Sequence, residues 1–136
     1  MDLETAMQLA AKGMKAQGTR MRVISENLAN AETTGKKAGD VPYQRQVITF
    51  KNEMDRATQT KQVEVDKIQP DKSDFVMKYD PGHPAANAQG YVAMPNVNPL
   101  VEMMDMREAQ RSYEANLGVI EVSRTMLMHT IDAIHD

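Results

Sequence analysis

The chain contains neither cysteine nor tryptophan. Without cysteine it has no disulfide framework, no thiolate zinc site and no cysteine nucleophile. It also lacks an apolar run of about 18 residues, the length that a bilayer-spanning helix needs, so we expect a protein that is not membrane-embedded. Glu4, Gln8 and Lys12 interrupt the N-terminal stretch. This stretch therefore does not resemble a cleaved secretory signal, which has a compact apolar centre.

An excess of charge of one sign is absent as well. The 16 Lys and Arg residues stand against 19 Asp and Glu residues, which gives a formal net charge of −3. A protein that binds nucleic acid needs a basic face that displaces counterions from phosphates. The charge balance therefore argues against a nucleic-acid partner.

The usual parts of an active site are missing. The three histidines, His83, His129 and His135, do not have the spacing of metal ligands on a helix. There is no glycine-rich phosphate loop, and no serine lies in a nucleophile-elbow motif. We expect no enzyme, no metal, no cofactor and no small-molecule substrate. An enzyme hypothesis has only the histidines in its favour.

Strong hydrophobes are scarce. Leu, Ile, Val and Phe make up 25 of the 136 residues, and the rest of the apolar content is mostly 15 Ala and 12 Met. A chain of this length forms one ordinary domain at most. So few bulky side chains do not bury enough apolar surface for a stable core, and a partner is expected to supply the remainder.

The N-terminal segment has the heptad pattern of a coiled coil. Asp2 and Glu4 lie where a helix N-terminus favours negative charge. Gln17 occupies the one polar position of an otherwise apolar or small seam, whose steps alternate between four and three residues. This pattern predicts a coiled-coil helix over residues 1–31. The seam consists of Leu3, Met7, Ala10, Met14, Met21, Ile24, Leu28 and Ala31.

The C-terminal segment, residues 97–136, is similar. Asn98 suits an N-cap and Pro99 suits the first turn of a helix. Gly118, in the middle of the predicted helix, indicates either a close approach of a neighbouring backbone or a tolerated cost. The second seam consists of Met103, Met106, Ala109, Tyr113, Leu117, Ile120, Leu127, Ile131 and Ile134.

The middle of the chain, residues 32–96, has the pattern of strands and turns. Strands are predicted over residues 43–50, 63–68, 75–79 and 91–94, the third with one apolar face. Residues 51–60 are polar and are predicted to be a loop or a helical turn. The expected fold class is α+β, with N- and C-terminal helices that pair as a coiled coil and a small β-hairpin-rich middle region. Segments 1–31 and 97–136 together would form one helical domain.

Several motifs carry a resemblance to a known family. Residues 25–30, Ser-Glu-Asn-Leu-Ala-Asn, followed by Thr34 and Gly35, resemble the Ser-x-Asn-Leu-Ala-Asn signature of flagellar axial proteins, which include rod, hook and hook-associated subunits. Four further segments are similar to the proximal-rod type of the bacterial basal body, the FlgC type. They are residues 42–47, 79–84, 90–97 and 111–116.

The resemblance implies a structural protein of the flagellar basal body. Such subunits stack helically with copies of themselves and with homologous rod proteins into the drive shaft that links the rotor ring to the hook. The implied partners also include the rotor-ring/rod junction protein and the flagellar type III export apparatus, which exports the chain to the periplasmic rod without a cleaved signal. The terminal helices would line the inner tube, and the middle region would form the outer layer.

The predicted assembly residues lie on the two seams and at the end of the first helix. Asn27 and Asn30 have three readings: their amides fix the register between neighbouring subunits, anchor the turn at residues 33–35, or form an ordinary helix-ending pair. Tyr113 is either a seam residue or a hydrogen-bonding anchor. The full set is Leu3, Met7, Met14, Met21, Ile24, Asn27, Leu28, Asn30, Met106, Tyr113, Asn116, Leu117, Ile120, Leu127 and Ile131.

A rival hypothesis comes from a different class of protein. A cytoplasmic helical adapter or export chaperone that binds a partner helix would also carry two apolar seams. It has no need, however, for a strand-rich middle region or for its turn motifs. A chaperone would stay in the cytosol, whereas a rod subunit would co-purify with basal bodies.

Overall fold

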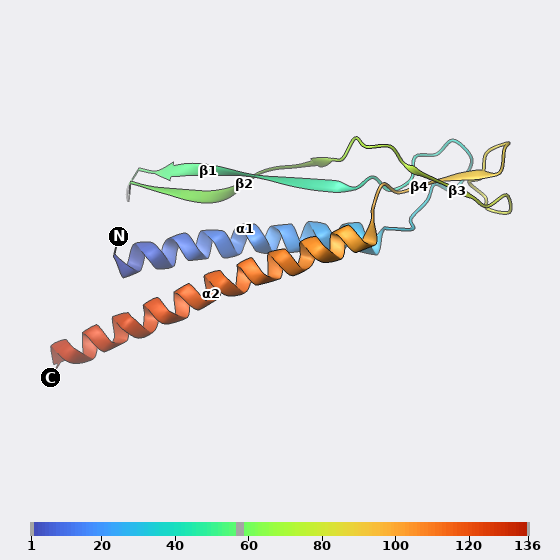
Figure 1. The fold of residues 1–136 in the computed structure, drawn as a ribbon. Coiled ribbons are helices and arrows are strands. Elements are labelled where there is room, and N and C mark those ends of the chain that lie inside the picture. The colour runs from blue at the N-terminus through green and yellow to red at the C-terminus, as the bar shows by residue number, and fades with distance from the viewer. Residues whose placement is uncertain (1, 57–58, 136) are drawn as a thin grey trace. The chain divides into compact units, whose positions relative to one another are not determined.

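The computed structural model has an α+β fold, which confirms the predicted class (Figure 1). It describes residues 2–56 and 59–135. None of the described helices has the length and apolarity needed to cross a membrane. The elements in chain order are α1 (Leu3–Ala29), β1 (Gln46–Asp55), β2 (Thr60–Pro70), β3 (Val76–Tyr79), β4 (Tyr91–Met94) and α2 (Pro99–His135).

Side-chain caps define where the two helices begin. Asp2 caps α1, since its Oδ1 accepts a hydrogen bond from the backbone N of Thr5 at 2.7 Å. Asn98 caps α2 in the same way, because its Oδ1 accepts from the backbone N of Leu100 at 3.1 Å, and Pro99 is the first helical residue. An N-cap satisfies backbone donors that have no partner within the helix. Both predicted helix starts are therefore confirmed to within two residues.

The strands form two separate two-stranded sheets, β1–β2 and β3–β4. β3 and β4 are antiparallel, with Val76 opposite Met94 and Tyr79 opposite Tyr91. The predicted strands at residues 63–68, 75–79 and 91–94 correspond to β2, β3 and β4, although β2 is longer at both ends.

The prediction of a loop or helical turn over residues 51–60 is wrong for most of that segment. Residues 51–55 continue β1, and Thr60 begins β2; residues 57–58 lie outside the described part of the chain. Polar side chains hold this part of the hairpin. Lys51 and Glu53 pair along one face at 2.7 Å, and Gln62 donates to Asp55 across the strands at 2.9 Å. The polar composition of residues 51–55 therefore led to a wrong prediction, because this part of β1 is held by its pairing with β2.

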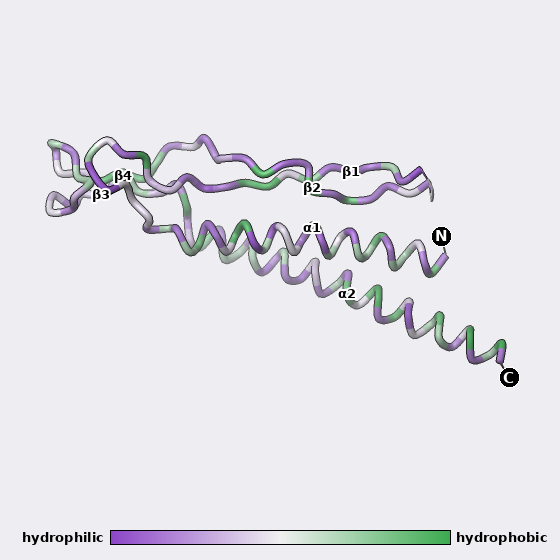
Figure 2. Tube along the Cα trace, turned by 180° about the vertical axis from the view of Figure 1, so that it is seen from behind, coloured by the Kyte–Doolittle hydropathy of each residue, from purple (hydrophilic) through white to green (hydrophobic). Residues whose placement is uncertain are grey.

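The chain divides into two compact units, each of which contains part of both helices. The first unit comprises Met1–Met21, Thr49–Lys67 and Arg107–Asp136, and the second comprises Arg22–Ile48 and Ile68–Met106. Figure 2 shows that hydrophobic and hydrophilic positions alternate at short intervals along both helices. Neither helix has a long uninterrupted apolar segment.

Both cores are thin. In the first unit the buried apolar residues are alanines, namely Ala10, Ala16 and Ala109. The core of the second unit contains mostly small aliphatic residues together with two buried polar ones. Its buried residues include Val23, Ile24, Ala85, Val92, Val97, Asn27 and Glu102.

Candidate functional site

Asn27, in the motif near the end of α1, is buried and joins the helix to the start of β1. Its side chain is paired with the backbone of Gln46: Oδ1 accepts from the N of Gln46 at 2.9 Å, and Nδ2 donates to the O of Gln46 at 2.9 Å. The hydroxyl of Tyr43 also donates to Asn27 Oδ1, at 2.7 Å. Only 1% of Asn27 is exposed. Its amide therefore acts inside the chain, where it replaces a strand partner for Gln46.

Asn30 completes the end of α1 and begins the following turn. Its Nδ2 donates to the backbone O of Glu26 at 2.8 Å, and its Oδ1 accepts from the hydroxyl of Thr33 at 3.1 Å. The backbone N of Thr33 also donates to the O of Asn30. These contacts are the ones expected if Asn30 anchors the turn after the helix.

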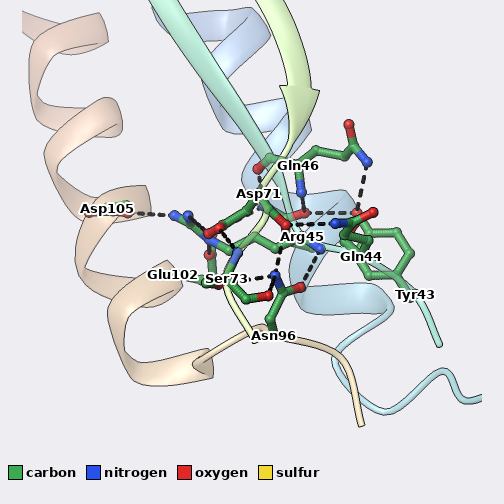
Figure 3. Close-up of polar contacts among 10 residues, drawn as sticks. Tyr43, Gln44, Arg45, Gln46, Asp71, Ser73, Asn96, Glu102 and Asp105 are labelled. Atoms are coloured by element: carbon green, nitrogen blue, oxygen red, sulfur yellow. Dashed lines mark hydrogen bonds and ion pairs between the residues drawn. The ribbon is translucent and has the colours of Figure 1, made fainter. Parts of the chain in front are cut away.

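Arg45 forms ion pairs with three carboxylates, those of Glu102, Asp71 and Asp105 (Figure 3). Its Nε donates to Glu102 in the first turn of α2. Its Nη1 lies 3.0 Å from Asp71 and its Nη2 lies 3.8 Å from Asp105. Glu102 is 1% exposed, and a buried carboxylate of this kind requires a charged partner. Arg45 therefore ties the start of β1 to the start of α2 and to the segment that follows β2.

Amide groups complete this network around Arg45. The Oδ1 of Asn96 accepts from the backbone N of Arg45 at 2.7 Å, while its Nδ2 donates to the O of Asp71 at 3.0 Å and to Ser73 at 3.1 Å. Gln44 Nε2 donates to the same Asp71 oxygen at 2.8 Å. Residues 43–45, predicted as the beginning of a strand, are thus held by side chains and precede β1.

The network shifts the pKa of three groups. Partial burial opposes the charge of Arg45, but its hydrogen bonds to Glu102 and Asp71 outweigh this effect and raise its pKa above the ordinary value. The pKa of Asp71 is lowered, chiefly because the backbone and hydroxyl of Ser73, and then Arg45, donate to the carboxylate. Burial, followed by the negative charges of Glu26 and Glu102, raises the pKa of Tyr43. The pKa shifts of Arg45 and Asp71 favour the charged form of each side chain, as in a network of structural ion pairs.

In the first unit, α1 and α2 approach each other closely at Gly13. A Cβ built on Gly13 would lie 2.7 Å from the Nδ2 of Asn116, so glycine allows this approach. Arg20 of α1 lies 3.5 Å from Glu108 of α2. Gly118, by contrast, has no atom within 4 Å of its would-be Cβ. A close approach of a neighbouring backbone was one interpretation of Gly118. Within the chain, the close approach of the two helices occurs at Gly13 instead.

Farther toward their ends the two helices leave an open groove. It has a volume of about 620 Å³ and is lined by Met7, Gln8 and Ala11 of α1 and by Ile120 and Leu127 of α2, together with Glu4. The buried Oε1 of Gln17 has no hydrogen-bond partner in the described part of the chain. The seam is therefore neither fully packed nor fully satisfied within one chain.

The predicted assembly residues fall into three groups. Ile24 and Asn27 are buried, and Leu117, Leu127 and Ile131 are exposed. The remaining members are half-buried, and they are Leu3, Met7, Met14, Met21, Leu28, Asn30, Met106, Tyr113, Asn116 and Ile120. The two helices are close at Gly13 and Asn116, whereas Met7, near the start of α1, and Leu127, in the last third of α2, line the open groove between them.

The sequence patterns did not single out Arg45, Asp71, Asn96 or Glu102 as a network. Arg45 and Asn96 lie inside two of the motifs that carry the family resemblance, but their partners are 23 to 57 residues away. The second contact face of α1 was also missed. Gln8, Lys12 and Lys15 lie outside the predicted seam of α1, yet they line a cavity together with Asp55 and Gln62 of the β1–β2 hairpin.

Comparisons with known proteins match both helices and nearly all of the chain. A family model described as "Flagella basal body rod protein" matches residues 7–37, and the model of the C-terminal part of the flagellar basal body rod FlgEFG proteins matches residues 88–133. The first match includes the motif that contains Asn27, and the second includes almost all of α2. Within the described residues no cluster of acidic or histidine side chains has the arrangement of a metal site.

Three curated relatives share the same description, flagellar basal-body rod protein FlgC. The protein of Agrobacterium fabrum is 49% identical over 132 residues, which cover 97% of this chain and 95% of the relative. The Bacillus subtilis protein is 39% identical, with 93% and 95% covered. The Salmonella typhimurium protein is 33% identical, with 96% and 97% covered. This chain therefore belongs to the FlgC family of flagellar basal-body rod proteins.

Proposed function

We propose that copies of this structural rod subunit stack helically with homologous rod proteins to form the proximal part of the drive shaft, which transmits torque from the rotor ring to the hook. Membership of the FlgC family supports a structural role in the rod of the basal body. The rival reading, a cytosolic adapter or chaperone, is not favoured by these relatives.

The observation that carries the proposal is the exposed apolar surface on the second half of α2. Val122 is 59% exposed, Met126 54%, Leu127 40%, Ile131 42% and Ile134 77%. A helix that is apolar on several faces is normally buried on several faces, and monomeric proteins rarely expose large contiguous apolar patches. Neighbouring subunits in a rod would cover this surface.

We infer that segments 1–31 and 97–136 form one helical domain in the rod, with α1 and α2 paired as a coiled coil. The contacts at Gly13 and between Arg20 and Glu108 support a pairing that begins within one chain. The open groove at Met7 and Leu127 and the unpartnered Oε1 of Gln17 indicate that neighbouring subunits complete it. Residues 32–96 would form the outer layer of the rod.

The predicted assembly residues divide into two roles under this proposal. The exposed and half-buried seam residues, such as Leu117 and Ile131, would contact neighbouring subunits. Asn27 and Asn30 would act inside the chain, because their amides bond to the backbone of Gln46 and to the turn at Thr33. They would fix the angle at which the middle region leaves α1.

The family resemblance further implies the route and the neighbours of this subunit. We propose that the flagellar type III apparatus exports it without a cleaved signal, and that it joins the rotor-ring/rod junction protein in the periplasmic space. We also propose that it is not an enzyme. The thin core of the chain supports this route, because an export channel passes unfolded chains.

The replacement Ile131→Asp tests the proposed assembly role. Ile131 is 42% exposed, so the charge should change the stability of the lone chain by less than about 0.5 kcal/mol, as at an ordinary surface position. The same charge should prevent rod assembly, because it would be buried against a neighbouring subunit. Isolated basal bodies should lack the chain, and the cells should not swim.

Ile131→Met is the matched control, since it keeps an apolar side chain at the same position. Control cells should swim, and their basal bodies should contain the subunit. Normal basal bodies with Ile131→Asp would contradict the proposal. Recovery of the unaltered protein only in the cytosolic fraction would favour the chaperone reading instead.

A further inference from the structure

The β1–β2 hairpin turns its polar face toward α1. Gln62 is 8% exposed and its Nε2 donates to Asp55 at 2.9 Å. Glu64, on the same face of β2, lies 3.5 Å from Lys12 of α1. Asp55 and Gln62 also share a cavity of about 420 Å³ with Gln8 and other residues of α1. Because successive strand residues point to opposite faces, this arrangement places the alternate residues on the side away from α1.

The face away from α1 is apolar and basic. It carries Phe50, which is 38% exposed, and Met54, which is 52% exposed. Strand alternation places Val63, also 38% exposed, on this face, although Val63 also lines a cavity with Lys12 and Ala16 of α1. The alternation of β2 places Lys61 and Lys67 on this face as well, and no acidic residue occupies an outward position of either strand. We call these five residues the outer hairpin face. Two-stranded sheets normally pack their apolar face against the rest of the chain. The β1–β2 hairpin has the opposite orientation, with its polar face toward α1 and its apolar face exposed.

The second unit contains an apolar groove over β3 and β4. Phe75, just before β3, and Met77 of β3 line it together with Tyr91 of β4 and the exposed loop residue Val41, and its volume is about 310 Å³. This volume corresponds to about ten water molecules, or to a few side chains. The predicted apolar face of β3 is thus the open one, while Val92, on the opposite face, is 1% exposed. We call this feature the β3–β4 groove.

The charges at the β3–β4 groove are acidic. Asp40 is the one charged residue in its lining, and the groove has no basic residue there. β3 itself begins two residues after Asp74 and ends just before Asp80. Lys78 is on the opposite face of β3 from Met77 by strand alternation. The groove therefore offers apolar side chains with a negative rim.

Charge determines which surfaces suit each other. Two outer hairpin faces placed together would bring Lys61 and Lys67 of one copy against those of the other. Two grooves placed together would bring acidic rims into contact. An outer hairpin face against a groove pairs apolar with apolar residues and lysine with aspartate, and complementary charges of this kind select partners and fix their register.

We propose that the outer hairpin face of one copy docks onto the β3–β4 groove of a second copy, head to tail. The two surfaces differ, so the contact is heterologous, and a heterologous contact that does not close into a ring propagates as an open helix. The inference rests on the proposed function, since it adds a contact between middle regions to the contacts between helices. A groove of this size gives a small contact, well below the area of a stable interface on its own.

Cysteine cross-linking tests this contact without background from the chain, because the protein contains no cysteine. Two full-length variants, Met54→Cys and Met77→Cys, are co-expressed, and isolated basal bodies are treated with a short thiol cross-linker. Met54 and Met77 are 52% and 53% exposed, so the substitutions leave the packing of the chain unchanged. Glu53→Cys with Met77→Cys is the matched control, because Glu53 lies on the opposite face of β1.

We expect a cross-linked species of twice 15.2 kDa that contains both variants and is at least tenfold more abundant than with the control pair. The pair Val63→Cys and Val41→Cys probes the same contact at two other exposed positions and replaces the first pair if that pair does not assemble. Equal yields for test and control pairs in basal bodies that hold both variants would overturn the inference and leave the proposed function intact. A cross-link from Met54→Cys to a different protein would overturn the inference too. Basal bodies that lack the unaltered chain would instead refute the proposed function itself.

Discussion

Among single residues, Glu102 is the most buried of the three carboxylates that contact Arg45, with 1% of its side chain exposed against 23% for Asp71 and 32% for Asp105. Replacing it by Gln removes the carboxylate that Arg45 Nε contacts and that lies 3.4 Å from the amide of Asn27. We expect the free energy of unfolding to fall by about 2–4 kcal/mol, slightly below the usual cost of breaking a buried ion pair because Arg45 keeps Asp71. Urea denaturation of the purified chain measures this change.

Glu26→Gln provides the control for that experiment. Glu26 lies 2.8 Å from Arg22, one helical turn away, and both side chains are at least half exposed. An exposed pair of this kind contributes about 0.3–0.5 kcal/mol. Equal losses for the two variants would show that the network at Arg45 does not hold the second unit together.

The lowered pKa of Asp71 makes stability depend on pH in the acid range. The unfolded chain lacks the donors of Ser73 and Arg45, so its carboxylate binds a proton at a higher pH than the folded one does. The stabilising contribution is therefore complete above about pH 4, the ordinary range of an aspartate, and is lost as the pH falls through the lower value of the folded state. We expect Asp71→Asn to flatten the loss of stability below pH 4, measured by denaturation at a series of pH values. An unchanged acid profile would contradict the assignment.

The sequence revealed individual residues of the site but not their partners. The motif at residues 25–30 drew attention to Asn27, and anchoring of the turn at residues 33–35 was one of the interpretations, but the amide of Asn27 bonds to residues beyond that turn. Its bonds to Gln46 and Tyr43 depend on a chain reversal that no local pattern encodes. Arg45 and Glu102 are 57 residues apart, and each taken alone is an ordinary charged residue.

At the scale of elements, Gly13 and Gly18 of α1 form a natural pair for comparison. A Cβ at residue 18 would meet no atom within 4 Å, whereas one at residue 13 would lie 2.7 Å from Asn116 Nδ2. Gly18→Ala should therefore raise stability by about 0.5–1 kcal/mol through helix propensity. Gly13→Ala should raise the stability clearly less than Gly18→Ala does, because the side-chain amide of Asn116 must turn away from the added methyl group. Thermal unfolding followed by circular dichroism measures both, and an equal gain would show that α1 and α2 do not approach at Gly13.

The helices were predictable from sequence, whereas the hairpin was predictable only in part. Asp2 and Asn98 are caps whose signal is local, and each helix begins where its cap indicates. Residues 51–55 carry no apolar alternation, and their strand depends on contacts with β2 such as that between Asp55 and Gln62. The orientation of the hairpin was equally hidden, since nothing in the sequence indicates that its polar face meets Lys12.

For the whole molecule, composition was the most informative feature. Only 25 of 136 residues are Leu, Ile, Val or Phe, and several of them, such as Ile131 and Ile134, remain exposed in the folded chain. Their burial would contribute roughly 25 cal/mol for each Å² of apolar surface removed from water. That stabilisation becomes available only when neighbouring subunits cover the helices. The molecule therefore has the properties of a part that is completed on assembly.

Hydrogen exchange on the full-length chain tests this central claim most directly. In dilute solution we expect the backbone amides of residues 117–135 to exchange nearly as fast as in an unfolded peptide, while the amides of Gln46 and Asp71, which donate within the second unit, stay protected. In isolated basal bodies residues 117–135 should become protected as well. Protection of these residues in the lone chain that equals the global stability and does not change with protein concentration would contradict the account.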